Sequence, residues 1–289
     1  MLALSRILAP IAFSARCKGA VQYAEALACH FHSELTLAHV VVPIQSYALP
    51  DAMAVAPEMM DELVAFAQTE LDRYARDEIK GISAKRELLE GDPATEIVRY
   101  AAEGEFDLII MPTHGYGPFR RFLLGSVTAK VLHDAPCPVW TGPHMENAAA
   151  YQSIDFRRVL CAIDLGPHSG AVLQWAADFA QDYGATLVVM YAIPGSTVTV
   201  GGVYFDPEWR EQVRSDAWNH ISSLLNETGI TAEIEIAAGD PPETVRAIAE
   251  ESHPNLLVIG RGGARGVIGR LRANAYGILR ESPCPIVAI

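Results

Sequence analysis

The hydrophobic residues of this chain fall in short continuous runs that are separated by longer amphipathic stretches. In the first half the runs cover Ile7 to Phe13, Leu35 to Val42, Leu108 to Met111 and Pro138 to Trp140. Continuous apolar runs of this length are typical of parallel strands that are covered on both faces. A more polar run, Ala84 to Leu89, predicts an edge strand.

The stretches between these runs have the pattern of helices. They cover Gly19 to His32, Pro57 to Ile79, Ala94 to Ala102 and Ser126 to Asp134. The second of them begins with proline and acidic residues and stops at Gly81, as helix termini prefer. Strands and helices that alternate in this way predict a parallel sheet with helices on both faces. Ligands of such sheets bind at the carboxyl ends of the strands.

The second half of the chain repeats the first. "RILAPIAFS" matches "RVLCAIDLG" at a shift of 152 (158 − 6), and "EGDPATEIV" matches "AGDPPETVR" at a shift of 148 (238 − 90). "APCPVW" matches "SPCPIV" at a shift of 147 (282 − 135). Shifts that drift so little indicate two copies of one domain. We predict two tandem flavodoxin-like, or Rossmann-like, α/β domains at 1–141 and 156–289, each a five-stranded parallel sheet, with a linker at 142–155.

Composition narrows the environment and the partners. The formal net charge of -13 argues against binding to nucleic acid or to anionic lipid, because both carry the same sign. No stretch reaches the roughly 20 uncharged apolar residues of a membrane span, and no signal peptide is apparent. The 5 cysteines form no CxxC pair. They fit free thiols in a reducing compartment, so we expect a cytoplasmic protein without nucleic-acid or membrane partners.

Candidate chemistry gathers after the fourth predicted strand, in "MPTHGYGPFRRFLLGSVTAK". Small residues there, Gly115, Gly125 and Ser126, stand between a buried strand and a helix. Glycines let a backbone approach phosphates closely, and amides at a helix start donate to them. The alternative is an ordinary strand-to-helix turn, because serine is also a good N-cap.

Both copies resemble the universal stress protein family in this loop. The family pattern is Gly, two residues, Gly, nine residues, then Gly-Ser or Gly-Thr. The first copy has Pro112, then Gly115, nine residues, and Gly125-Ser126; the second has Gly260, Gly263, nine residues, and Ala273-Asn274. The resemblance covers both halves almost end to end, including the "GDP" and "PCP" motifs. It implies a tandem universal stress protein.

The resemblance also implies a ligand. Nucleotide-binding members of the family hold ATP at this loop, with an aspartate at the end of the first strand on the adenosine side. The cofactor-binding residues that it assigns here are Val40, His114, Gly115, Gly125, Ser126, Asp164, Gly260, Gly263 and Asn274. The expected cofactor is ATP, with Mg²⁺ as an optional companion. Asp164 has the alternative role of capping the turn "DLGPHS".

Each copy departs from the family pattern at a different place. The first has Ala12 in place of the aspartate and Pro112 in place of the leading glycine, and proline removes an amide donor. The second lacks the Gly-Ser pair but carries Arg261, Arg265, Arg270 and Arg272 nearby. Those arginines are candidates for phosphate contacts or for a solvated face. We expect the first copy to hold the triphosphate, because it keeps more of the backbone donors.

Three functions follow from these features. No Ser-His-Asp signature, zinc spacing or Walker lysine is present, so we expect a stress-response protein that binds an adenine nucleotide and is not primarily an enzyme. The alternatives are a slow ATP hydrolase and an interaction protein that has lost nucleotide binding.

The last strand of each copy is apolar, and we expect these two edges to pair with each other. A homodimer of the chain is a further alternative.

Overall fold

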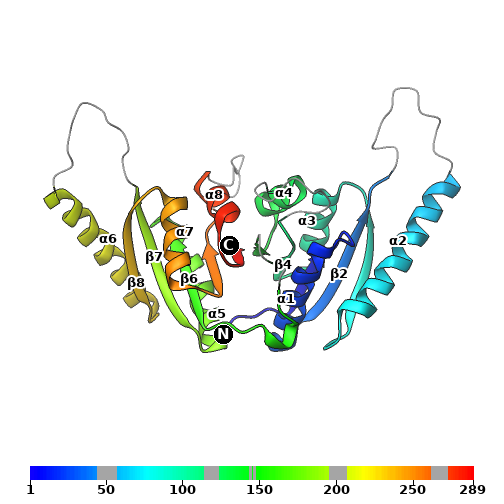
Figure 1. Ribbon diagram of the computed structural model, residues 1–289, viewed down its shortest axis with the longest axis horizontal. Coiled ribbons are helices and arrows are strands. Elements are labelled where there is room, and N and C mark those ends of the chain that lie inside the picture. Colours follow the sequence, from blue (N-terminus) through cyan, green and yellow to red (C-terminus); the bar gives the residue numbers. More distant parts are fainter. Residues whose placement is uncertain (44–56, 114–123, 143–144, 146–147, 195–206, 262–272) are drawn as a thin grey trace, which may run out of the picture. The chain divides into compact units, whose positions relative to one another are not determined.

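The computed structural model describes residues 1–43, 57–113, 124–142, 145, 148–194, 207–261 and 273–289. Two compact units make up the chain. The N-terminal unit is Ala3–Ile154, and the C-terminal unit is Asp155–Ile289 together with Met1–Leu2. Each unit is a parallel α/β sheet, which is the fold class that the alternating pattern predicts (Figure 1).

The N-terminal unit has a sheet of order β3-β2-β1-β4-β5, in which all paired strands run parallel. Its strands are β1 (Arg6–Pro10), β2 (Glu34–Val41), β3 (Ala84–Glu90), β4 (Leu108–Ile110) and β5 (Val139–Thr141). Its helices are α1 (Ala15–Phe31), α2 (Pro57–Glu78), α3 (Pro93–Glu103) and α4 (Ser126–Asp134), followed by a short 3-10 helix, η3 (Tyr151–Ser153).

The C-terminal unit repeats this arrangement with the order β8-β7-β6-β9-β10. Its strands are β6 (Arg158–Ile163), β7 (Thr186–Pro194), β8 (Glu233–Gly239), β9 (Leu256–Ile259) and β10 (Ile286–Ala288). Its helices are α5 (Ser169–Tyr183), α6 (Pro207–Thr228), α7 (Pro241–Ser252) and α8 (Ala273–Glu281).

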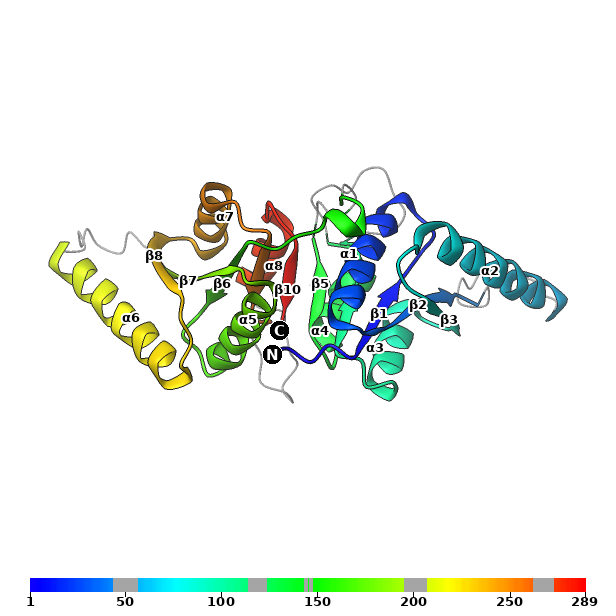
Figure 2. The ribbon, with the colours of Figure 1, turned by 90° about the horizontal axis from the view of Figure 1, so that it is seen from below.

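Helices cover both faces of each sheet. Figure 2 shows α1 and α2 on one side of the N-terminal sheet and α3 and α4 on the other, and α5–α8 repeat this division in the C-terminal unit. The division follows from right-handed crossovers, because the first two connections run outward from the central strand and the next two run the opposite way. The central strands are therefore apolar beyond the arginines that begin β1 and β6, and Leu8, Leu108, Leu160 and Leu257 are fully buried.

The first strand of the N-terminal unit ends earlier than the apolar pattern predicts. The run Ile7 to Phe13 predicts a longer strand than β1, which stops at Pro10. Phe13 has a φ of 53° and its counterpart Leu165 a φ of 56°, so both repeats leave the sheet through a left-handed turn. The helix that follows also begins earlier than predicted, at Ala15 and not at Gly19.

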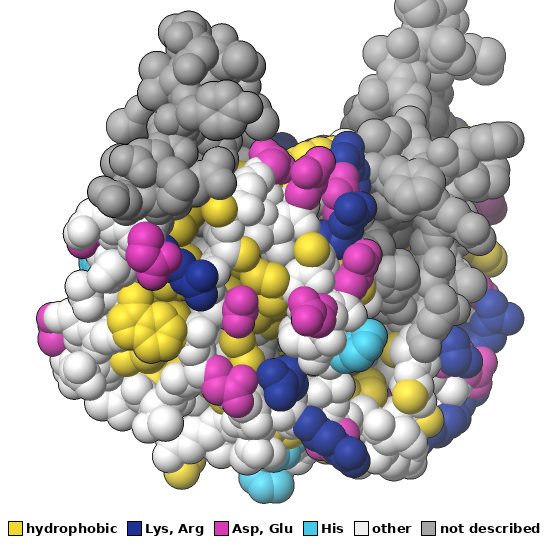
Figure 3. Space-filling view, turned by 60° about the vertical axis from the view of Figure 1, so that its left-hand side comes forward, with side chains coloured by type: hydrophobic (Ala, Val, Ile, Leu, Met, Phe, Trp, Pro, Cys, Tyr) yellow, Lys and Arg dark blue, Asp and Glu magenta, His cyan; other side chains and the backbone are white. Residues whose placement is uncertain are grey.

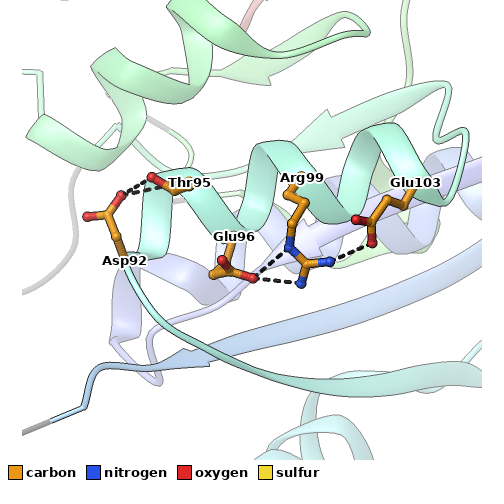
Figure 4. Close-up of polar contacts among 5 residues, drawn as sticks. All are labelled: Asp92, Thr95, Glu96, Arg99 and Glu103. Atoms are coloured by element: carbon orange, nitrogen blue, oxygen red, sulfur yellow. Dashed lines mark hydrogen bonds and ion pairs between the residues drawn. The ribbon is translucent and has the colours of Figure 1, made fainter.

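The "GDP" motif forms the corner between β3 and α3. Gly91 has a φ of +139°, which residues with side chains rarely adopt, and Pro93 occupies the first helical position. Asp92 is the N-cap, and its carboxylate accepts the backbone N–H of Thr95 at 3.0 Å. Figure 4 shows this cap, and one turn further on Arg99 bridges Glu96 and Glu103.

The long helices α2 and α6 leave large apolar side chains on the surface. Phe66 of α2 is 64% exposed and Trp218 of α6 is 48% exposed. Figure 3 shows hydrophobic side chains between charged ones on the face that carries α6. Among the described residues, no helix combines the length and the hydrophobicity that crossing a bilayer requires.

Candidate functional site

A cavity of about 290 Å³ opens in the C-terminal unit where the central strands end. It lies at the carboxyl ends of β6, β7 and β9, and the first turns of α5 and α8 close its sides. This is the switch point of the sheet, because the connections leave β6 and β9 in opposite directions. The residues that line it are Ala162, Ile163, Asp164, Pro167, His168, Ser169, Val172, Met190, Tyr191, Ala192, Pro241, Val245, Ile259, Gly260, Asn274, Ala275 and Ile278.

Asp164 lines this cavity and also caps the turn that follows β6. Its Oδ1 accepts the backbone N–H of Gly166 at 2.9 Å and the hydroxyl of Ser169 at 3.2 Å. The turn-capping role that the sequence left open is therefore present. The carboxylate is exposed and is the one acidic side chain among the described lining residues. It can accept hydrogen bonds from a ligand that enters the cavity.

Gly260, which follows β9, and Asn274 of α8 line the same cavity. A Cβ on Gly260 would lie 3.3 Å from Cγ2 of Val172, so the missing side chain lets β9 and α5 approach closely. Asn274 is exposed in the first turn of α8, where backbone N–H groups have no partner within the helix. Asp164, Gly260 and Asn274 are thus brought together, whereas Gly263 lies outside the described residues.

Tyr191 and the apolar wall of the cavity were missed by the sequence reasoning. Burial raises the pKa of the Tyr191 hydroxyl, and the nearby carboxylate of Asp164 raises it further. Val172, Met190 and Ile278 add aliphatic surface. The repeat contained a signal for Tyr191. The shift of 152 that relates the first strands also aligns Tyr191 with His39 near the end of the second strand (191 − 39 = 152).

The matching corner of the N-terminal unit has different side chains. Ala12 stands in place of Asp164, and its backbone N–H donates to Sγ of Cys17 at 3.3 Å. The ring centroids of His39 and Phe13 lie 4.3 Å apart, and Nδ1 of His39 donates to the carbonyl oxygen of Ile11 at 2.9 Å. Burial lowers the pKa of the His39 imidazole, although the hydrogen bond to Ile11 opposes the shift.

The remaining predicted residues of the N-terminal copy lie at two places. Gly125 is the N-cap of α4 and donates its N–H to the carbonyl oxygen of Thr113 at 2.8 Å. Ser126 is the first helical residue and is exposed, so it is not the N-cap that its residue type suggested. Val40 is half-buried near the end of β2. His114 and Gly115 lie outside the described residues.

The basic residues near the two loops are described only in part. Lys130 of α4 donates to Oδ1 of Asp92 at 3.0 Å and to Oγ1 of Thr95 at 2.8 Å. The backbone N–H of Arg261 donates to the carbonyl oxygen of Ile289 at 2.9 Å. Arg265, Arg270 and Arg272 lie outside the described residues. Within the part of the chain that is described, no group of three or more His, Cys, Asp or Glu side chains is placed to hold a metal ion.

Comparison with known proteins matches both halves of the chain to one family. The family model described as "Universal stress protein family" matches residues 4–141 and again 155–289. A universal stress protein of Mycolicibacterium smegmatis is 25% identical over 98% of this chain and 96% of its own length. Universal stress protein A homolog 1 of Coxiella burnetii is 29% identical over 46% of this chain and 96% of its own length.

A solved structure has the same fold over both units. The crystal structure of a universal stress protein from Archaeoglobus fulgidus aligns with a TM-score of 0.67 and 22% identity. The alignment covers 98% of this chain and 95% of that one.

Proposed function

The chain belongs to the universal stress protein family, and from that premise we propose that its C-terminal unit binds an adenine nucleotide. The observation that carries the proposal is the cavity at the ends of β6 and β9, which is lined by Asp164, Gly260 and Asn274. Its volume of about 290 Å³ lies at the lower end of the range for small-molecule sites. A nucleoside would fill it, with the phosphates extending toward the start of α8.

The residues present fit each part of such a ligand. The aliphatic side chains of Val172, Met190 and Ile278 offer an apolar surface for a base. The carboxylate of Asp164 accepts hydrogen bonds from a ribose hydroxyl or from an exocyclic amine. The first N–H groups of α8 point outward from the helix start and attract phosphate oxygens. Mg²⁺ would accompany the phosphates.

The N-terminal unit is the second candidate, and the prediction that it holds the triphosphate rests on its backbone donors. Gly125 and Ser126 stand at the start of α4, where the first helical N–H groups would donate to a phosphate. Val40, His114 and Gly115 are the other residues that the family resemblance assigns to this site. Ala12 offers no carboxylate to the adenosine side. Replacing Gly125 with valine would obstruct the phosphates, so a loss of ATP affinity in that variant would assign this unit as a site.

The proposed role is binding and regulation in a cytoplasmic stress response. Asp164 already holds a turn through the N–H of Gly166 and the hydroxyl of Ser169, so we expect turnover of ATP to be slow. A steady-state ATPase rate that disappears in the Ser126→Ala variant would instead support the hydrolase alternative.

Calorimetric titration of ATP into the full chain tests the proposal. The Asp164→Asn variant keeps an oxygen that can accept the N–H of Gly166 but loses the charge, so the fold is preserved. A hydrogen bond to a charged group contributes about 1.5–3 kcal/mol, and we expect ATP affinity to fall about tenfold or more. The matched control is Asp216→Asn on α6, away from the cavity, which should bind like the unmodified chain. Equal ATP affinity for both variants would exclude the C-terminal cavity and leave the N-terminal unit as the site, whereas no ATP binding to the unmodified chain would leave the interaction-protein alternative.

A further inference from the structure

The end of the segment that joins the two repeats is attached to the N-terminal unit. The backbone N–H of Tyr151, at the start of η3, donates to Oε1 of Gln22 on α1 at 2.8 Å. The same Gln22 side chain uses its Nε2–H to donate to the carbonyl oxygen of Glu78 at 3.4 Å. One side chain of α1 therefore holds both the joining segment and the end of α2.

The ring of Tyr151 lies on Gly81, just after α2. A Cβ added to Gly81 would be 2.6 Å from the phenolic oxygen and 2.8 Å from Cε2 of Tyr151. Contacts that short do not occur, so the ring can occupy this place only because residue 81 has no side chain. Gly81 needs no unusual backbone angle here; it is required for space.

A buried carboxylate fixes the turn that carries Gly81. Glu25 of α1 is 0% exposed, and its Oε1 accepts the backbone N–H of Lys80 at 2.6 Å and also the N–H of Gly81. Its Oε2 has no hydrogen-bond partner among the described residues. Burial of a charged carboxylate costs free energy because the group loses its hydration. The hydrogen bonds from the two backbone donors offset this cost for Glu25. These two hydrogen bonds hold the backbone turn on which the ring of Tyr151 lies.

The chain is anchored again only a few residues later, in the C-terminal unit. Phe156 is 1% exposed and packs edge-on against Phe179 at 5.1 Å and Tyr183 at 4.9 Å between ring centroids. Between the two aromatic anchors, Gln152, Ser153 and Asp155 are exposed and Ile154 is half-buried.

The geometry points to a clamp and a hinge. The clamp consists of Tyr151, Gly81 and Gln22, and it makes the end of the joining segment part of the N-terminal unit. The hinge consists of Ile154 and Asp155, which follow η3. The chain passes between the units a second time at Ala3, because Met1 and Leu2 belong to the C-terminal unit. This assignment is independent of nucleotide binding. It also divides the predicted linker 142–155 into an attached part and a short free part.

Hydrogen exchange of the full chain tests the clamp from both sides of the contact. Gly81→Ala displaces the ring without altering the joining segment, and Tyr151→Ala removes the ring itself. We expect both variants to exchange the amides of 148–154 about tenfold faster or more, because the helix η3 loses its support. Tyr151→Phe keeps the ring and should exchange like the unmodified chain.

The controls separate the clamp from a general loss of stability. Gly170→Ala is the matched glycine control, because a Cβ there meets Leu224 Cδ1 at an ordinary 3.9 Å. Amides of β1 should stay equally slow in all variants. The clamp is overturned if Gly81→Ala exchanges like the unmodified chain or if Tyr151→Phe exchanges like Tyr151→Ala. Limited proteolysis reports the hinge: within 148–157 we expect the unmodified chain to be cut at 154–155, and first cuts at 148–153 would contradict the assignment.

Discussion

Asp92 and Thr95 are joined by two hydrogen bonds, since Oδ1 of Asp92 accepts both the backbone N–H of Thr95 at 3.0 Å and its hydroxyl at 2.5 Å. The other repeat has the same "GDP" motif, but its N-cap Asp240 makes no side-chain capping bond. Residue 243 is glutamate there, and Thr244 bonds the main-chain oxygen of Asp240 at 2.8 Å. Identical motifs thus cap α3 and α7 differently.

This difference predicts unequal effects of the two alanine substitutions. Replacing an N-cap aspartate by alanine costs about 0.5–2 kcal/mol when its capping bond is lost. We expect Asp92→Ala to lower the urea midpoint of unfolding by an amount in that range, and Asp240→Ala to lower it less. Urea denaturation of the full chain, followed by circular dichroism, measures both. A larger loss for Asp240→Ala would contradict the assigned caps.

The same carboxylate predicts a pH dependence. The Thr95 hydroxyl, the Thr95 N–H and the Lys130 ammonium together lower the pKa of Asp92 from its usual 3.8 to about 2. Because the pKa in the folded chain is lower than in the unfolded chain, the carboxylate stabilises the fold above about pH 4. That contribution is lost as the pH falls from about 4 to about 2. A carbon-detected NMR titration should give a low value for Asp92, and Lys130→Met should raise it.

The complementary defects of the two copies predict that each can be repaired. Ala273→Gly with Asn274→Ser restores the family's pair at the start of α8, and Ala12→Asp restores the carboxylate in the N-terminal unit. A regained charged hydrogen bond is worth about 1.5–3 kcal/mol, so ATP should bind about tenfold more tightly or better in the repaired unit. The α8 repair should gain more, because phosphates carry most of the ligand's charge. Calorimetric stoichiometry and affinity distinguish the units, and unchanged values for both repairs would exclude these positions from a nucleotide site.

The pairing of the two final strands stays a prediction, and amide exchange can test it. The carbonyl oxygens of Pro138 and Trp140 accept N–H groups of β4 at 3.0 Å, so these residues face β4. In a parallel ladder the alternate residues, Val139 and Thr141, then direct their N–H groups to the other edge. If that edge is paired, both amides should exchange as slowly as those in the middle of the sheet. Fast exchange at Val139 and Thr141 would mean an unpaired edge.

The sequence predicted the order of strands and helices well, and the reason is the burial of the central strands. Runs such as Leu108 to Met111 are apolar because helices cover both faces, and this leaves a readable pattern. The ends of β1 and α1 were less predictable. An aromatic residue such as Phe13 is uncommon at positive φ, so the residue type gives no signal that the chain turns there.

The candidate site was predictable where the repeat marked it and not elsewhere. Asp164 and Gly260 stand out because the first copy has Ala12 and Pro112 at the matching positions. Tyr191 and Val172 reach the cavity through strand pairing and helix packing, which a single sequence does not express. The contact of Tyr151 with Gln22 joins positions 129 residues apart, so local pattern carries no trace of it.

The two aromatic anchors also limit how far apart their points of attachment on the two units can lie. Tyr151 and Phe156 are five residues apart (156 − 151), and a fully extended chain spans at most about 3.3–3.6 Å per residue. However the units turn, the Cα atoms of these two residues cannot separate by more than about 17–18 Å. A tether this short keeps each repeat at an effective concentration on the order of millimolar around the other. Surfaces on the two halves that fit each other will therefore meet within one chain before either meets a second molecule.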